Sequence, residues 1–121
     1  MFDNKHNKLI VAVFKGGCSS EREISLASGE AVATALREAG HFVHEIDLKK
    51  NKLPILPDNT QVVFPVLHGS FGEDGGIQAL LEDAKIPFVG SSSSASRTIM
   101  NKILTKRILE EHAVLTPQYR A

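Results

Sequence analysis

The sequence has a single cysteine, no excess of either charge and no long hydrophobic run, and each shortage excludes a class of protein. Cys18 can form no internal disulfide and no cysteine-rich metal site, which is typical of a reducing cytoplasm. Fourteen Lys and Arg residues balance fourteen Asp and Glu residues, so no net charge attracts nucleic acid or an anionic membrane. The longest unbroken apolar run, residues 9–14, is too short for a membrane span or a signal-peptide core. We therefore expect a cytoplasmic protein with neither a nucleic-acid nor a membrane partner.

Length and composition indicate one folded domain. A chain of 121 residues lies near the commonest domain size. Apolar residues make up 42% and charged residues 23%, values that are ordinary for a soluble globular domain and argue against a disordered or fibrous class.

The first forty residues follow the order strand, glycine turn, helix. The apolar run 9–14 predicts a strand that is covered on both faces, and it leads into Gly16 and Gly17. Ser20 and Glu23 have the spacing of a capping box, so a helix is expected from near Glu21, and Gly40 suits the left-handed residue that ends a helix. Apolar residues at helical spacing are expected to form its buried stripe: Ile24, Val32, Ala35, Leu36 and Ala39.

Three more strands and two more helices are expected. The strands are short apolar segments at residues 42–46, 60–67 and 87–89, and Pro65 requires an edge or a bulge in the second of them. Asp74 is positioned to cap a short helix. Its core-facing residues are Ile77, Leu80, Leu81 and Ala84. One last helix, carried by Ile99, Met100, Ile103, Leu104 and Ile108, is expected to stop before Pro117.

Alternating strands and helices predict an α/β fold with an open, mostly parallel Rossmann-like sheet and helices on both faces. Such sheets bind ligands at the carboxyl ends of their strands. Two loops lie there, at residues 16–23 and 68–74.

The first of these loops favours a cationic ligand over a phosphate. It lacks the third glycine of the dinucleotide fingerprint, and Glu21 and Glu23 add negative charge at the expected helix start. A carboxylate there can hold an ammonium group through a charge-assisted hydrogen bond. The alternative is structural, because acidic residues in a first helical turn also cap amides and offset the helix dipole. Glu23 suits that capping role, and Glu21 is freer to bind a ligand.

The second loop contains a histidine at a strand end. His68 could donate a hydrogen bond to a ligand carboxylate, and the glycines around it permit a tight turn. The alternative is a histidine whose hydrogen bonds are satisfied within a structural turn. The loop by itself does not decide between the two interpretations.

Two segments of the chain match a known family. Residues 63–69 (VFPVLHG), followed by 72–75 (GEDG) and Gln78, resemble the N-terminal signature of D-alanine:D-alanine ligases of the ATP-grasp superfamily. Residues 16–26 (GGCSSEREISL) resemble the first glycine loop of that family, and residues 87–91 its fourth strand. The similarity runs from about residue 9 to residue 119, and it implies the pre-ATP-grasp form of the Rossmann-like sheet.

The resemblance assigns roles to four residues. Glu21 would orient the amino group of the first D-alanine as a catalytic and substrate-binding residue, with Ile24 and His68 as further substrate-binding positions. Lys102 would reach bound ATP, whereas Lys106, one turn later, is better explained as a solvated surface lysine. No residue is assigned to a metal.

The chain departs from the family pattern at two places. Asn101 stands where the family usually has aspartate, and residues 91–94 lack a glycine that is often found there. Neither departure falls in the two substrate loops.

The reaction implied by the resemblance joins two D-alanines. ATP phosphorylates the carboxylate of one, and the amine of the second attacks the acylphosphate, while Mg²⁺ and an arginine stabilise the developing charge. The product serves peptidoglycan synthesis, hence cell-wall biogenesis and cell shape. The metal ligands and the ATP-grasp domains would lie after residue 121, so we expect a truncated chain that is inactive by itself.

The resemblance also divides the chain and leaves alternatives. Residues 1–8 are expected to be a flexible lead-in, residues 9–113 the N-terminal substrate domain, and residues 114–121 the start of a linker. A D-alanine:D-lactate ligase would have the same domain. A stand-alone Rossmann-type nucleotide module, with Asp47 binding a ribose hydroxyl, is a second alternative. A third is a domain that forms homodimers through an apolar helix face, as the family does.

Overall fold

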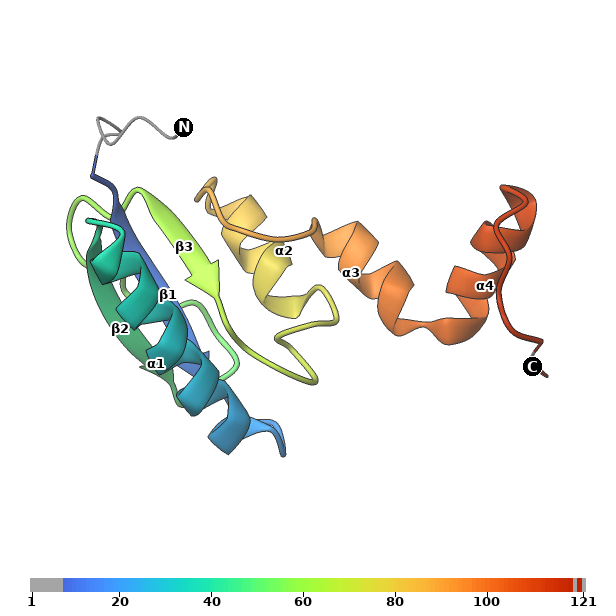
Figure 1. Cartoon of the computed structure of the whole chain (residues 1–121), viewed down its shortest axis with the longest axis horizontal. Helices are drawn as coiled ribbons and strands as arrows, with labels where there is room; N and C mark the ends of the chain where they lie inside the picture. Colours follow the sequence, from blue (N-terminus) through green and yellow to red (C-terminus); the bar gives the residue numbers. More distant parts are fainter. Residues whose placement is uncertain (1–7, 119, 121) are drawn as a thin grey trace.

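The computed structural model describes residues 8–118 and Arg120, so the lead-in expected at residues 1–8 lies, apart from Lys8, outside the described residues. Three strands and four helices follow one another along the chain (Figure 1). They are β1 (Ile10–Gly16), α1 (Arg22–Glu38), β2 (Phe42–Leu48), β3 (Val62–Pro65), α2 (Gly76–Asp83), α3 (Ser93–Met100) and α4 (Lys102–Glu111).

The three strands form one parallel sheet in the order β2-β1-β3. Ile10 pairs with Phe42 on one side of β1, and Val11 pairs with Val62 on the other. The strand expected at residues 87–89 is reduced to one parallel bridge between Val63 and Phe88. The prediction of an open parallel α/β sheet is confirmed.

Helices cover both faces of the sheet because successive side chains of β1 point to opposite sides. Val11 and Val13 pack with Ala33 of α1. Ala12 and Phe14 pack on the other face, in a cluster that includes Ile77 and Leu81 of α2. The continuous apolar run therefore predicted the burial of both faces correctly.

Pro65 breaks no hydrogen bond to β1. The Val66 amide donates to Phe14 O at 2.8 Å, whereas the Val63 amide donates outward to Pro87 O at 2.9 Å. Amides alternate in direction along a strand, so the position of Pro65 corresponds to that of Val63 and faces away from β1. The proline fits because β3 is an edge of the named sheet.

The capping box expected at Ser20 and Glu23 is absent from the start of α1. Residue 21 is the cap residue and makes no side-chain capping bond. Ser19 acts instead, because its hydroxyl accepts from the Glu21 amide at 3.1 Å. At the other end, Gly40 follows the helix with φ +98°, as expected.

The buried face of α1 differs from the predicted stripe. Ile24, Ala35 and Ala39 are exposed, and the fully buried residues are Ser25, Gly29 and Ala33. Gly29 is needed because a Cβ there would lie 2.4 Å from Lys15 Cβ on β1. The Ser25 hydroxyl accepts a hydrogen bond from the Gly16 amide at 2.9 Å and donates one to Val66 O. The buried face of α1 consists of small residues that let the helix lie close to β1, and a pattern of large apolar residues does not predict them.

Asp74 lies one residue before Gly75, the cap residue of α2, and its side chain holds the start of the helix by hydrogen bonds. Its carboxylate accepts from the amides of Phe71 and Gly76, each at 3.0 Å, while Gly75 with φ +96° is the cap residue. Ile77 and Leu81 are buried as expected, but Ala84 is exposed.

The single last helix that was expected is two helices, separated at Asn101. Asn101 ends α3 and begins α4, and its side chain accepts from the Leu104 amide at 3.0 Å. A side-chain oxygen at a helix start satisfies an amide that has no partner within the helix. An aspartate would offer the same acceptor, so the departure at this position preserves the cap.

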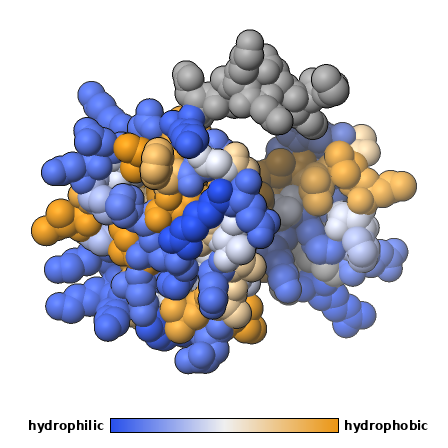
Figure 2. Space-filling view, turned by 60° about the vertical axis from the view of Figure 1, so that its left-hand side comes forward, coloured by the Kyte–Doolittle hydropathy of each residue, from blue (hydrophilic) through white to orange (hydrophobic). Residues whose placement is uncertain are grey.

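The apolar residues of α3 and α4 lie largely at the surface. Ile99, Met100, Ile103 and Leu104 are each at least 40% exposed. Figure 1 shows α4 at the opposite end of the molecule from the sheet. In Figure 2, apolar areas alternate with hydrophilic ones on the visible face. Among the helices of residues 8–118, none has the length and apolar content to cross a membrane.

Candidate functional site

Parallel strands bring the two predicted loops together at one edge of the sheet. The Ser19 hydroxyl donates to His68 O at 2.8 Å and accepts from the Glu21 amide at 3.1 Å. One side chain therefore links the loop after β1 to the loop after β3. The link fixes Glu21 near the backbone of His68.

The Glu21 carboxylate faces the second loop instead of capping α1. A Cβ added to Gly69 would lie 2.8 Å from Glu21 Oε2, which places the carboxylate directly against that glycine. Gly69 itself has φ +75°, a conformation that favours glycine. Glu21 is exposed, and none of the hydrogen bonds between described residues uses its carboxylate. It can therefore bind a cationic group of a ligand.

Glu73 holds His68 and its loop. Its Oε1 lies 3.4 Å from His68 Nδ1, and its Oε2 accepts from the Gly69 amide at 2.9 Å. The other ring nitrogen, His68 Nε2, is buried and has no hydrogen-bond partner among the described residues. The interpretation of His68 as a fully satisfied histidine therefore fails at this atom.

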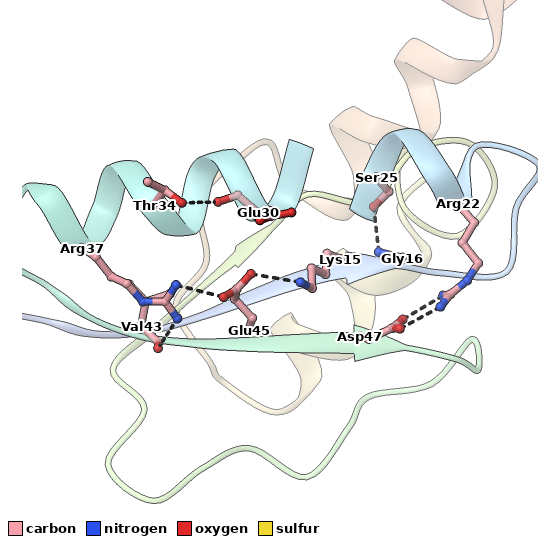
Figure 3. A network of polar contacts seen from close by, with 10 residues as sticks. All are labelled: Lys15, Gly16, Arg22, Ser25, Glu30, Thr34, Arg37, Val43, Glu45 and Asp47. Carbon is pink, nitrogen blue, oxygen red and sulfur yellow. Dashed lines mark hydrogen bonds and ion pairs between the residues drawn. The ribbon is translucent and has the colours of Figure 1, made fainter. Parts of the chain in front are cut away.

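An ion pair secures the start of α1 to the end of β2 (Figure 3). Arg22 donates to both oxygens of Asp47, at 2.8 and 2.7 Å, and also to Gly17 O at 3.2 Å. Hydrogen bonding from Arg22 holds the pKa of Asp47 below its ordinary value. Because both carboxylate oxygens are engaged, the alternative role of Asp47 as a ribose ligand loses its support.

A second group of charges lies between the sheet and α1, away from the two loops (Figure 3). Glu45 accepts from Lys15 at 3.0 Å and from Arg37 at 2.9 Å. These hydrogen bonds, that from Lys15 first, lower the pKa of Glu45. The group connects β1, β2 and α1 and so supports the scaffold.

In the described part of the chain, the other two residues assigned by resemblance make no contact that links them to these loops. Ile24 lies in the first turn of α1 and is 60% exposed. Lys102 begins α4, a helix that packs only against α3 among the described elements. Both assignments remain predictions.

Lys106 is not the solvated lysine that was expected. It is half-buried, and its Nζ donates to Thr116 Oγ1 at 3.1 Å and to Pro117 O at 2.8 Å. The lysine ties the end of the chain to α4, which is a structural role.

Across residues 8–118, no three His, Cys, Asp or Glu side chains come together in a way that could hold a metal ion.

Sequence reasoning missed three residues that shape this edge: Ser19, Glu73 and Gln78. Ser19 had a detectable signal, because a serine can accept a hydrogen bond from the backbone amide two residues further on, here that of Glu21. Glu73 and Gln78 carried no signal beyond their places in the family motif. Gln78 Nε2 donates to Gly72 O at 2.9 Å, a contact that depends on how the loop folds.

Known proteins resemble this chain in sequence and in fold. The family model described as D-ala D-ala ligase N-terminus matches residues 48–91. The D-alanine--D-alanine ligase of Aquifex aeolicus is 50% identical over 113 residues, which is 90% of this chain and 38% of that protein. The ligase of Moorella thermoacetica is 49% identical over 92% of this chain and 36% of its own length.

Solved structures of D-alanine–D-alanine ligases resemble this chain in fold. The D-alanine-D-alanine ligase from Aeromonas hydrophila superposes with a TM-score of 0.84 at 27% identity, over 94% of this chain and 50% of that one. This chain is similar in sequence and in fold to the N-terminal part of D-alanine–D-alanine ligases. The ligase from Bacillus anthracis, solved in complex with ATP, gives a TM-score of 0.80 at 28% identity, over 93% of this chain and 38% of that one.

The chain spans little more than a third of the length of the two curated relatives, at 38% and 36%. The matched segment 48–91 contains His68, Glu73 and Gln78. Glu21 lies outside that segment but inside the longer alignments, which cover at least 90% of this chain.

Proposed function

We propose that this chain binds the first D-alanine of an ATP-dependent ligase that joins two D-alanines through an acylphosphate. The observation that carries the proposal is the Glu21 carboxylate, which lies against Gly69 and takes no part in capping α1. A carboxylate in this position can hold the ammonium group of an amino acid by a charge-assisted hydrogen bond.

The residues around Glu21 orient it in this proposal. Ser19 sets its distance from His68 through two hydrogen bonds, of 2.8 and 3.1 Å. His68 lies near the carboxylate of the bound D-alanine. A substrate held at both its ammonium group and its carboxylate keeps one orientation, which favours reaction by lowering the entropy cost of alignment.

ATP would supply the phosphoryl group that activates that carboxylate, and Lys102 is the residue of this chain proposed to contact it. Mg²⁺ would accompany the ATP, held by parts of the whole enzyme other than this chain.

The wider role follows from the same proposal. Residues 9–113 form the N-terminal substrate domain, and residues 114–121 lead toward the ATP-grasp part of the whole enzyme. That enzyme makes a peptidoglycan precursor, in the cytoplasm and as a homodimer, and so supports cell-wall biogenesis and cell shape. The exposed apolar residues of α3 and α4 provide surface for contacts between parts of the whole enzyme.

Titration with D-alanine tests the proposal. We expect D-alanine to shift the amide signals of residues 19–21 and 68–69 in the nuclear magnetic resonance (NMR) spectrum of the ¹⁵N-labelled chain. Glu21→Gln removes the charge and should weaken binding about tenfold or more. Glu30→Gln is the matched control, because Glu30 is also exposed on α1 but lies outside both loops.

Propionate, which lacks the ammonium group, should cause none of these shifts. If Glu21→Gln binds D-alanine as tightly as Glu30→Gln does, Glu21 is not the ammonium ligand and the proposal fails.

The proposal also predicts that the 121-residue chain alone has no ligase activity. Phosphate release should stay at background when the chain is incubated with ATP, Mg²⁺ and D-alanine. Release that depends on D-alanine would contradict this prediction.

A further inference from the structure

The loop after β3 determines which nitrogen of the His68 ring can bind a ligand. Glu73 Oε1 lies 3.4 Å from His68 Nδ1, and a carboxylate can only accept, so Nδ1 carries a proton. Glu73 Oε2 accepts from the Gly69 amide at 2.9 Å, and this second bond keeps the carboxylate beside the ring. The nitrogen left for a substrate is therefore Nε2.

His68 Nε2 is buried and has no hydrogen-bond partner among the described residues. A proton on it would add a positive charge and leave a buried N–H without an acceptor, which costs more than an unpaired lone pair. In the chain without substrate we therefore expect the neutral ring, with its one proton on Nδ1. A ligand can approach the ring from a cavity of about 290 Å³, which His68 lines together with Gln78 and Ser96.

The neutral ring in this form cannot hold a carboxylate. An unprotonated Nε2 and a carboxylate oxygen are both acceptors, so no hydrogen bond can form between them. When D-alanine places its carboxylate at His68, Nε2 must gain a proton and donate it, while Nδ1 continues to donate to Glu73. The proton comes from solvent, and the only new covalent bond is the N–H bond.

We propose that D-alanine binding draws one proton from solvent onto His68 Nε2, and that Glu73 is the positioning residue that makes this uptake necessary. The inference rests on the proposed function and adds to it a dependence of substrate affinity on pH.

The charged groups that face His68 suit a ring that is protonated only with substrate bound. Glu73 lies at Nδ1, and the Glu21 carboxylate lies against Gly69 in the loop after β1. Helices α2 and α3 contribute Gln78 and Ser96 to the cavity, which do not titrate, and its lining residues include no lysine or arginine. In the complex, each charge has an opposite partner: Glu21 pairs with the substrate ammonium, and the imidazolium lies between Glu73 and the substrate carboxylate.

NMR of the His68 ring nitrogens reads the proton directly. In the free ¹⁵N-labelled chain at about pH 8, Nδ1 should give the signal of an N–H nitrogen and Nε2 that of an unprotonated one. Saturation with D-alanine should convert both signals to the N–H type. The Kd for D-alanine should rise about tenfold per pH unit between about pH 7.5 and 8.5, which is the slope for one proton.

Glu73→Gln separates this role from a purely structural one. The amide oxygen of the new side chain can still accept from the Gly69 amide, which turns its NH₂ group toward His68 Nδ1. Nδ1 then accepts, the ring proton moves to Nε2, and the neutral ring can donate to a carboxylate without taking up a proton. We expect the variant to lose the tenfold slope, whereas damage to the loop alone would weaken binding equally at every pH.

His68→Gln removes the titrating ring and should lose the slope as well. The matched controls, His44→Gln on β2 and Glu30→Gln on α1, change exposed residues outside both loops and should keep it. They also retain any contribution that titration of the substrate amine makes to the measured slope.

Three results would overturn the inference: D-alanine binding by wild type without the slope, a free His68 ring already protonated on Nε2 at about pH 8, or a wild-type slope in Glu73→Gln. Each leaves the proposed function standing, provided that Glu21→Gln still weakens D-alanine binding. If wild type binds no D-alanine at all, the proposed function fails and this inference fails with it.

Discussion

Replacing Gly69 by alanine should displace the Glu21 carboxylate without unfolding the protein. The new Cβ would lie 2.8 Å from Glu21 Oε2 and 3.1 Å from both Cβ and Oγ of Ser19. The carboxylate is the free end of a flexible side chain, so it moves away at low cost. Gly69→Ala is therefore a test of the position of Glu21 that leaves Glu21 itself unchanged.

Gly69→Ala should reduce both the stability of the fold and the affinity for D-alanine, for different reasons. Alanine at φ +75° costs about 1–2 kcal/mol of unfolding free energy, because its Cβ crowds the following carbonyl. For a domain of this size that loss lowers Tm by about 4–8 °C. Losing a charge-assisted hydrogen bond to D-alanine should weaken its binding by about 10- to 100-fold.

Gly40→Ala is the matched control. Gly40 has φ +98°, but a Cβ there would meet no atom within 4 Å. It should therefore lower Tm by a similar amount and leave the D-alanine titration unchanged. Thermal unfolding by circular dichroism and D-alanine titration by NMR measure the two effects. If Gly69→Ala and Gly40→Ala bind D-alanine equally well, the Glu21 carboxylate does not act from beside Gly69.

Three further predictions concern the scaffold. Asn101→Ala should cost about 1 kcal/mol and reduce helicity in far-UV circular dichroism, whereas Asn101→Asp should not, because it keeps the acceptor for the Leu104 amide. A double-mutant cycle of Arg22→Gln and Asp47→Asn in urea should give a coupling of about 0.5–1 kcal/mol, since both side chains are about a third exposed; zero coupling would contradict it. The pKa values of Asp47 and Glu45 lie below their ordinary values of 3.8 and 4.5, so the unfolded chain binds more protons than the folded chain in acid. The free energy of unfolding should therefore fall as the pH drops below about 4.5. The fall should be smaller in a variant that carries both Asp47→Asn and Glu45→Gln.

Local pattern was sufficient for the parallel sheet and for the meeting of the two loops. The apolar run at residues 9–14 required burial on both faces, which a parallel sheet between two layers of helices provides. Parallel strands also end at one edge, so the loops that follow β1 and β3 had to lie together. The meeting of Glu21 with the His68 loop follows from these two facts.

Local pattern failed at two helix starts. Ser20 had the spacing of a capping box, but Ser19 accepts the Glu21 amide because its hydroxyl also reaches His68 O, 49 residues away. In the same way, the periodicity of residues 99–108 predicted one helix, and Asn101 divides it by capping the second half. The local preferences of residues for helix starts do not include long-range hydrogen bonds such as that from Ser19 to His68 O.

The sequence by itself determined the parallel α/β architecture, the two loops and their acidic character, because periodicity, glycine and charge act over a few residues. Only the tertiary structure decided which polar atoms find partners. His68 Nε2 and Gln78 Oε1 face one cavity without partners, while both oxygens of Asp47 are engaged by Arg22. Hydrogen bonds and exclusion of water depend on atoms brought together from distant parts of the chain, and no local pattern records that arrangement.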